Sequence, residues 1–111
     1  MISRDSANQP GTRTMLKYSI VIATYNRAAD LRETLNSLAG LQPDGSWEVI
    51  VVDNNSPDET RAVVQETTAS FPVQLRYLFE PEQGRSPALN CGTRAAAGAI
   101  VVTTDDDVRV P

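Results

Sequence analysis

The sequence has no histidine and a single cysteine among its 111 residues. Without histidine, the chain cannot supply an imidazole base, a Ser-His-Asp triad or an imidazole ligand for a metal ion. One cysteine cannot form an internal disulfide or a CxxC zinc site. Oxygen atoms are therefore the ligands that this chain can offer to a divalent cation.

Long hydrophobic runs are missing as well. No apolar run approaches the roughly 20 residues that a transmembrane helix needs, and the first residues are polar, so no signal peptide is evident. Residues 1–16 show no hydrophobic period and are predicted to form a flexible tail, with Met15 as a hypothetical natural start. We expect a cytoplasmic protein with no membrane segment.

Positive charge is in short supply. The chain carries 10 basic and 14 acidic residues, for a formal charge of −4. A nucleic-acid-binding surface calls for a net basic face, so nucleic acid is not an expected partner. Hydrophobic residues make up 41% and charged residues 22% of the chain, which is typical of one folded globular domain or part of one.

The remaining sequence alternates between two hydrophobic periods. Residues 19–23 form a β-branched apolar run typical of a strand buried on both faces, whereas Leu31, Leu35 and Leu38 recur at helical spacing. Ser-Pro pairs at 56–57 and 86–87 are typical of helix starts with serine as the N-cap. Strands and helices are predicted to alternate over residues 18–23, 28–40, 47–52, 56–70, 74–79, 86–97 and 99–104.

This order of elements predicts an α/β fold with an open, mostly parallel, Rossmann-like sheet and helices on both faces. Right-handed crossovers favour the strand order 3-2-1-4, which places the topological switch between the first and fourth strands. Ligands of such sheets bind beyond the carboxyl ends of the strands at the switch. Functional residues are therefore expected in the loops that follow the strands.

Three adjacent aspartates, Asp105, Asp106 and Asp107, come directly after the last predicted strand. Adjacent carboxylates repel one another, and a hard cation such as Mg²⁺ or Mn²⁺ relieves the repulsion through oxygen ligands. If the strand period continues, Asp105 and Asp107 share one side and Asp106 faces away. A solvated acidic turn or a helix N-cap is the alternative, but the position at the switch favours a metal site.

The other strand ends leave two interpretations open. Asp53 either binds a ribose or a base edge, or forms an Asx-turn with residues 54–56. Tyr25 either stacks on a planar base or packs over the end of the sheet, and Arg85 either pairs with phosphate or is a surface residue. Residues 24–27 contain no glycine, which excludes a dinucleotide-type phosphate loop.

Four segments together resemble the family-2 glycosyltransferases of GT-A fold, over about residues 18–111. The segments are 19–27, 49–56, 84–92 and 105–107, in that order. The resemblance implies transfer of a sugar from a nucleotide diphosphate donor to an acceptor hydroxyl, usually with inversion. It implies a UDP-sugar foremost as the donor, Mn²⁺ or Mg²⁺ as the cofactor, and residues 17–111 as the donor-binding part of the enzyme.

The resemblance also assigns individual positions. The loop after the first strand would contact the base and ribose, Asp53 the base edge and Arg85 the nucleotide, while the aspartate triplet occupies the DxD position. The donor-binding residues it implies are Ala23, Thr24, Tyr25, Asp53, Arg85, Asp105 and Asp106, and the metal ligands are Asp105, Asp106 and Asp107. The family usually places a variable residue between its acidic ones, whereas all three are Asp here.

No catalytic residue is expected within the chain, because the family's general base would lie beyond Pro111. We therefore expect the chain to be the donor half of an enzyme, with little or no activity alone. An apolar sheet edge without its neighbours predicts self-association. The alternatives are a non-catalytic nucleotide-binding module and, less favoured, a nucleotidyltransferase, which would normally show a glycine-rich phosphate loop after the first strand.

Overall fold

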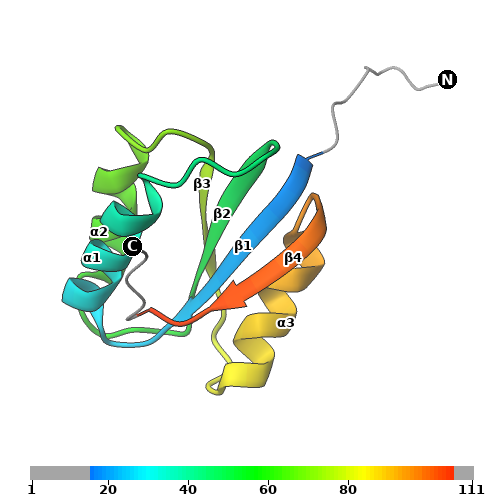
Figure 1. Ribbon diagram of the computed structural model, residues 1–111. Helices are drawn as coiled ribbons and strands as arrows, with labels where there is room; N and C mark the ends of the chain where they lie inside the picture. The colour runs from blue at the N-terminus through cyan, green and yellow to red at the C-terminus, as the bar shows by residue number, and fades with distance from the viewer. Residues whose placement is uncertain (1–15, 107–111) are drawn as a thin grey trace, which may run out of the picture.

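The computed structural model describes residues 16–106, in which strands and helices alternate along the chain (Figure 1). β1 begins at Leu16, the last residue of the predicted tail, and residues 1–15 and 107–111 lie outside the described part. The elements are β1 (Leu16–Thr24), α1 (Ala28–Leu38), β2 (Trp47–Asp53), α2 (Thr60–Thr68), β3 (Leu75–Phe79), α3 (Arg85–Ala95) and β4 (Gly98–Thr104).

The four strands form one parallel sheet in the order β3-β2-β1-β4, as the sequence predicted. β1 is central, and its last residue, Thr24, is in register with Asp53 at the end of β2. Since parallel strands point the same way, the loops that follow them gather at one edge of the sheet, the lower edge in Figure 1. β3 lies at the opposite side of the sheet from β4, which confirms its predicted edge position.

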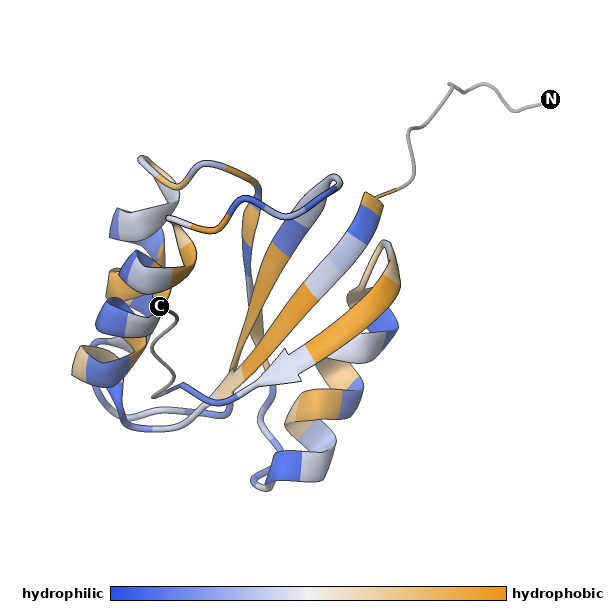
Figure 2. Cartoon of the chain, in the orientation of Figure 1, coloured by the Kyte–Doolittle hydropathy of each residue, from blue (hydrophilic) through white to orange (hydrophobic). Residues whose placement is uncertain are grey.

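Helices cover both faces of the sheet. In Figure 1, α1 and α2 lie side by side on one face and α3 lies alone on the other. Under α1 and α2, the core joins Leu31 and Leu35 to Ile22 of β1 and Val51 of β2, all fully buried. Hydrophobic colour is accordingly concentrated in the strands, and the helices show mixed colours (Figure 2).

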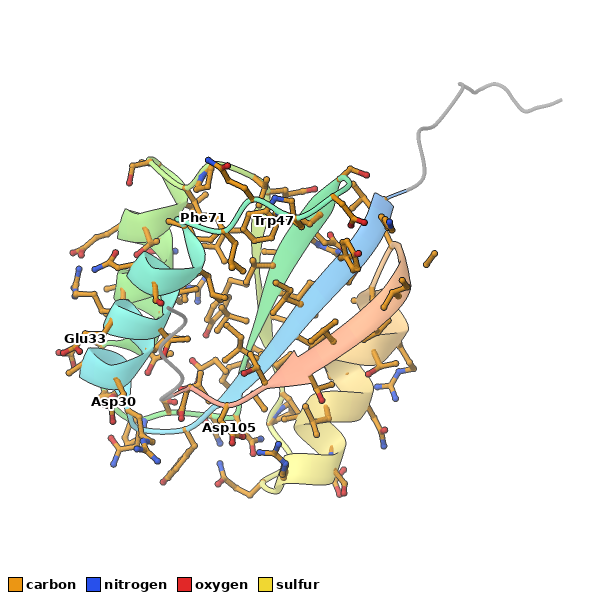
Figure 3. All side chains as sticks on the ribbon, viewed as in Figure 1. Asp30, Glu33, Trp47, Phe71 and Asp105 are labelled. Carbon is orange, nitrogen blue, oxygen red and sulfur yellow. The ribbon has the colours of Figure 1, made fainter. Side chains whose placement is uncertain are left out.

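The two ends of the sheet differ in what fills them. Near the amino ends of the strands, Trp47 and Phe71 pack edge to face with ring centroids 6.1 Å apart, and Figure 3 shows them at the end of the molecule away from Asp105.

On the face of the sheet that α3 covers, a Cβ at Gly92 would lie 2.4 Å from the side chain of Val21. α3 thus sits so close to the sheet that glycine is required at this position.

The helix starts differ from the prediction at both Ser-Pro pairs. α2 begins at Thr60, because the Asp58 carboxylate accepts hydrogen bonds from the Thr60 backbone and hydroxyl. The Ser56 hydroxyl, predicted as the N-cap, instead accepts a 2.9 Å bond from the backbone N–H of Asn26. α3 begins one residue early, at Arg85, and ends at Ala95, so residues 96 and 97 were wrongly included in the helix.

β4 is an edge strand with exposed apolar side chains. Ile100, Val101 and Val102 are 46%, 37% and 43% exposed, although they form the middle of the strand. β1 pairs with β4 on one side and β2 on the other, whereas β4 pairs with β1 alone among the described residues. Figure 2 shows this hydrophobic strand beside β1, away from α1 and α2.

A buried carboxylate joins the strands near their amino ends. Glu48 of β2 is 1% exposed and accepts bonds from the Ser19 hydroxyl (2.6 Å), the Ala97 N–H (2.8 Å) and the Arg76 guanidinium (3.1 Å). Burial by itself would raise the pKa of Glu48, but these hydrogen bonds outweigh it and lower the pKa below its ordinary value. The sequence analysis did not single out this network.

Glu48→Gln should lower the unfolding free energy at pH 7 by about 1–3 kcal/mol, because hydrogen bonds to a charged group are lost. The folded pKa lies below the unfolded pKa of about 4.3, so the unfolded chain binds the proton more readily and the contribution disappears as the pH falls below that value. Urea unfolding at pH 7 and pH 3.5 should show a larger wild-type advantage at pH 7. An advantage that grows in acid would contradict this, and Glu82→Gln, at an exposed position, is the matched control.

Candidate functional site

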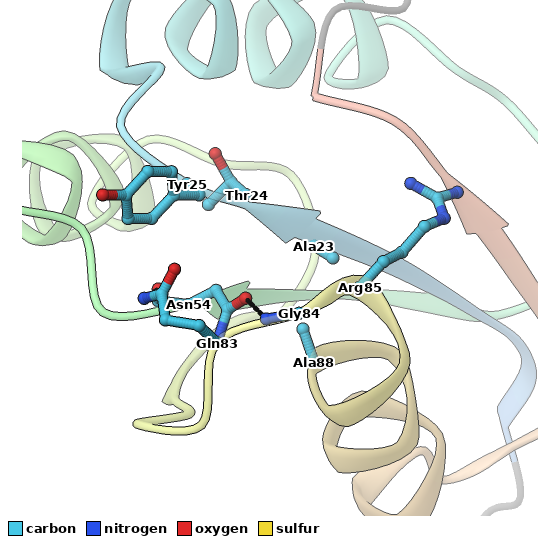
Figure 4. Close-up of a pocket in the computed structure, with 8 residues that line it drawn as sticks. All are labelled: Ala23, Thr24, Tyr25, Asn54, Gln83, Gly84, Arg85 and Ala88. Carbon is cyan, nitrogen blue, oxygen red and sulfur yellow. Dashed lines mark hydrogen bonds between the residues drawn. The ribbon is translucent and has the colours of Figure 1, made fainter.

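The loops at the carboxyl edge of the sheet enclose a cleft of about 280 Å³. It lies between the end of β1, the end of β2 and the start of α3 (Figure 4). Its walls combine small apolar side chains with amide, hydroxyl and guanidinium groups. The lining residues are Ala23, Thr24, Tyr25, Asn54, Gln83, Gly84, Arg85 and Ala88.

A second hollow of about 370 Å³ adjoins the first and shares Ala23, Tyr25 and Arg85 with it. Its other lining residues are Arg27, Asp105 and Asp106. The two hollows therefore form a continuous cleft that runs from the amide of Asn54 to the carboxylates after β4. The structure brings together six of the predicted site residues here: Ala23, Thr24, Tyr25, Arg85, Asp105 and Asp106.

Asn54 organises one wall of this cleft, and the sequence analysis missed its role. Its side-chain amide donates to the carbonyls of Glu80 (3.0 Å) and Glu82 (2.7 Å), and its side-chain oxygen accepts from the N–H of Gly84 (2.9 Å). Its backbone carbonyl accepts from the side-chain amide of Gln83 (2.6 Å). One 6% exposed side chain thus holds the loop before α3 in place.

Gly84 is the point at which that loop turns into α3. Its φ of 132° lies in the region that favours glycine, and it precedes the first helical residue, Arg85. The dashed line in Figure 4 marks its bond to Asn54. No local sequence signal identifies this wall, because the hydrogen-bond partners of the Asn54 side chain lie 26 to 30 positions further along the chain.

Asp53 is 3% exposed, and its carboxylate is engaged by neighbours within the chain. One oxygen accepts from the Ser56 N–H at 2.9 Å, which is the Asx-turn alternative, and the other accepts from the Tyr77 hydroxyl at 2.6 Å. Burial of the phenol and this hydrogen bond raise the pKa of Tyr77 to about 12. Asp53 does not line either hollow described above, and its contact with a base edge stays a prediction.

Asp105 and Asp106 face in different directions. The Asp105 side chain is 55% exposed and pairs with the Arg85 guanidinium at 2.8 Å, at the lower edge of the molecule in Figure 3. Asp106 is 7% exposed and accepts a 2.8 Å bond from the Thr24 hydroxyl. Their divergence agrees with the alternation predicted for this pair, and Asp107 lies outside the described residues.

Two cations lie against these two carboxylates. Arg85 neutralises Asp105, and the Arg27 side chain lies 3.7 Å from the other Asp106 oxygen. Within residues 16–106, no three acidic or cysteine side chains gather closely enough to hold a metal ion by themselves. Asp105 nevertheless offers exposed carboxylate oxygens, the donor type that Mg²⁺ and Mn²⁺ prefer.

Tyr25 stands at the junction of the two hollows. It is 46% exposed and contributes to both of them, so its ring is available to a ligand. Thr24 lies beside it but is only 3% exposed, and its hydroxyl is committed to Asp106. Of these two neighbours, Tyr25 is thus the one that offers a ligand an open surface.

A model of the glycosyl transferase family 2 matches residues 19–111. The chain therefore belongs to this family, and its fold matches part of a solved structure of such an enzyme.

Two relatives illustrate the match. A mannosyltransferase from Pyrobaculum calidifontis, solved in complex with GDP-Man and Mn²⁺, superposes with a TM-score of 0.79 and 31% identity, covering 95% of this chain and 33% of that one. Staphylococcus aureus TarS, in complex with UDP, superposes with a TM-score of 0.72 and 32% identity, covering 82% and 27%.

Curated relatives give the same picture. The dolichol-phosphate mannosyltransferase of Pyrococcus furiosus is 32% identical over 96 residues, which are 86% of this chain and 27% of the relative. The chain thus spans about a third or less of the lengths of these three relatives. Among the described residues, no helix has the length and apolar character needed to cross a membrane.

Asn54→Leu should release the loop at residues 80–84, because three side-chain hydrogen bonds are lost while the number of side-chain heavy atoms and their branching are kept. Limited trypsin digestion after Arg85 should become several-fold faster, and the unfolding free energy should fall by about 1–2 kcal/mol. Asn90→Leu, at an exposed position of α3, is the control and should leave cleavage at Arg85 unchanged. Equal rates in both variants would show that Asn54 does not hold the loop.

Proposed function

We propose that this chain is the donor-binding part of an inverting glycosyltransferase that takes a nucleotide diphosphate sugar, UDP-sugar foremost, together with Mn²⁺ or Mg²⁺. The observation that carries the proposal is the continuous cleft at the switch point, with an exposed aromatic ring in its middle and an Arg85–Asp105 pair at one end. Family membership and relatives solved with GDP-Man and with UDP support it.

The nucleoside would occupy the hollow between Tyr25 and Asn54. Tyr25 offers a ring face to a planar base, and Ala23 and Ala88 leave room for it because their side chains are small. Gln83 and Asn54 supply amides on the same wall, although the hydrogen bonds described above engage them. Asp53, behind this wall, would contribute at the base edge after an exchange of its present partners.

The diphosphate would lie toward Asp105. Asp105 would hold a divalent ion there, and the ion would supply Lewis-acid stabilisation of the charge that develops on the leaving diphosphate. Because Arg85 occupies Asp105 in this structure, the guanidinium has to leave the carboxylate for a cation to reach the Asp105 oxygen that it contacts. Arg85 then becomes available to a phosphate oxygen, for which a guanidinium is a suitable partner.

Sugar transfer by the whole protein needs a base for the acceptor hydroxyl. The relatives are about three times as long as this chain or longer, and the base and the acceptor site are proposed to belong to the part that the chain does not match. We expect the 111-residue chain to bind donor without appreciable transfer. Its cytoplasmic location stays a prediction.

Calorimetric titration of the chain with UDP should show binding that Mn²⁺ strengthens at least tenfold and that chelator reverses. Asp105→Asn should remove most of this Mn²⁺ effect, since the exposed oxygen donor loses its charge. Asp44→Asn is the matched control, because Asp44 is an exposed carboxylate that pairs with Lys17 away from the cleft. GDP in place of UDP tests the nucleotide preference, and failure of every nucleoside diphosphate to bind would overturn the proposed function.

The exposed edge of β4 is proposed to pair with β4 of a second copy. Its apolar side chains fit such an association, and so does an outer edge that pairs with no other strand of residues 16–106. Sedimentation of the wild-type chain should show a dimer, and Val102→Lys should shift it to monomer. Phe79→Lys at the opposite edge strand, where Phe79 is 51% exposed, should leave the dimer intact. A wild-type monomer at micromolar concentration would contradict the pairing.

A further inference from the structure

The segment that carries the aspartates is tied to the rest of the molecule by buried polar groups. The Asp106 side chain is only 9% exposed and accepts from the Thr24 hydroxyl at 2.8 Å. The Arg27 side chain approaches its other oxygen to 3.7 Å. Asp106 therefore stands among donors from β1 and the loop that follows it, whereas Asp105 next to it stands in the open cleft.

A threonine of α1 completes this attachment. Thr34 is fully buried, and its hydroxyl donates a 2.8 Å bond to the backbone carbonyl of Asp106, 72 positions further along the chain. Leu31 and Leu35, its neighbours on the helix, pack in the hydrophobic core. A hydroxyl buried beside leucines is costly unless it is hydrogen-bonded, so the bond to Asp106 gives this polar residue a structural reason to lie there.

This attachment is important for the residues after β4, because few other groups bury that strand. Ile100 and Val102 are exposed in the middle of the strand, and the pairing of β4 with β1 ends at Thr104. Asp105 and Asp106 follow that last pair, so the sheet itself does not fix their direction. Within the described residues, the bonds from Thr24 and Thr34 to Asp106 hold the chain directly after the ladder.

We propose that Asp106 and Thr34 form an anchor that fixes the direction of Asp105, and that Asp106 acts as a positioning residue and not as a ligand of the metal. This inference rests on the proposed function for the role of Asp105, and it revises the earlier expectation that all three aspartates ligate. It also assigns a role to Thr34, which lies outside every segment that the sequence analysis connected with the site.

The test uses a substitution that cannot touch the metal. Thr34→Val removes only the hydroxyl, and Thr34→Ser keeps it. The matched control is Thr67→Val in α2, where the lost hydroxyl also donates a 2.8 Å bond to a backbone carbonyl, that of Val63. UDP titrations of each chain, with Mn²⁺ and with chelator, give the factor by which Mn²⁺ strengthens UDP binding.

Thr34→Val should reduce this Mn²⁺ factor about fivefold, which is roughly the effect of one hydrogen bond, while UDP affinity in chelator stays unchanged. Thr34→Ser should restore the factor, and Thr67→Val should leave it unaltered. Asp106→Asn should reduce it to a similar extent as Thr34→Val, and Asp105→Asn should remove most of it. An Asp106→Asn chain as unresponsive to Mn²⁺ as Asp105→Asn would identify Asp106 as a ligand and overturn the proposal.

A second measurement does not depend on donor binding. Amide hydrogen exchange at residues 103–106 should be several-fold faster in Thr34→Val than in the wild type and in Thr67→Val. Unchanged exchange would overturn the anchor, whatever the titrations show. If the wild-type chain bound no nucleotide while Thr34→Val still loosened residues 103–106, the proposed function would fail and the structural part of the anchor would stand.

Discussion

The parallel register of β1 with its two neighbours is the constraint on which the site depends. Thr24 ends β1 opposite Asp53 at the end of β2, and Ile22 pairs with Thr104 at the end of β4. Loops that are 30 to 80 residues apart in sequence therefore leave the sheet at one edge. A shift by one residue would turn Thr24 away from Asp106 and bring the wrong face of the strand to the core.

The charges of the cleft are balanced before any ligand arrives. Arg85 lies against Asp105, and Arg27, which also pairs with Asp30 at 3.1 Å, approaches Asp106 to 3.7 Å, so each of the two aspartates that line the cleft has a cation nearby. An anionic diphosphate that bound alone would be repelled by the carboxylates, and a divalent cation that bound alone would be repelled by the guanidinium groups. Under the proposed function, joint binding of the two would satisfy both sets of groups, because an arginine released from a carboxylate could pair with a phosphate.

Much of the fold could be predicted because strong periodic signals and general topology rules agreed. The apolar runs located the strands, and the crossover rule then gave the order β3-β2-β1-β4. The start of α2 was less predictable, since the Asp58 carboxylate accepts the hydrogen bonds of Thr60 while the Ser56 hydroxyl accepts from the backbone of Asn26. The cleft was located by the topological switch, and the chemistry of its ends followed from the residues there.

The roles of Asn54 and Thr34 could not be predicted, because their partners are distant in sequence. In the sequence, Asn54 is one of several polar residues in a turn, and its bond to the Gly84 N–H forms only when the loop before α3 packs against it. In the sequence, Thr34 is one polar residue in a leucine-rich helix, and its bond to the Asp106 carbonyl forms only when the chain after β4 packs against α1. Glu48 is similar, since nothing local reveals that a glutamate in the second strand will find a hydroxyl, an amide and a guanidinium.

The attachment of the loop at residues 80–84 has a consequence for how such a cleft can diversify. One wall of the cleft is made by strands and by α3, which Gly92 brings against the sheet, so a change at a buried position such as Ala88 disturbs the core. The other wall is a surface loop in which residues 81–84 are all exposed and whose shape depends mainly on Asn54. Substitutions in that loop can reshape the cleft without repacking the interior, so a change of ligand preference can be gained there at little cost in stability.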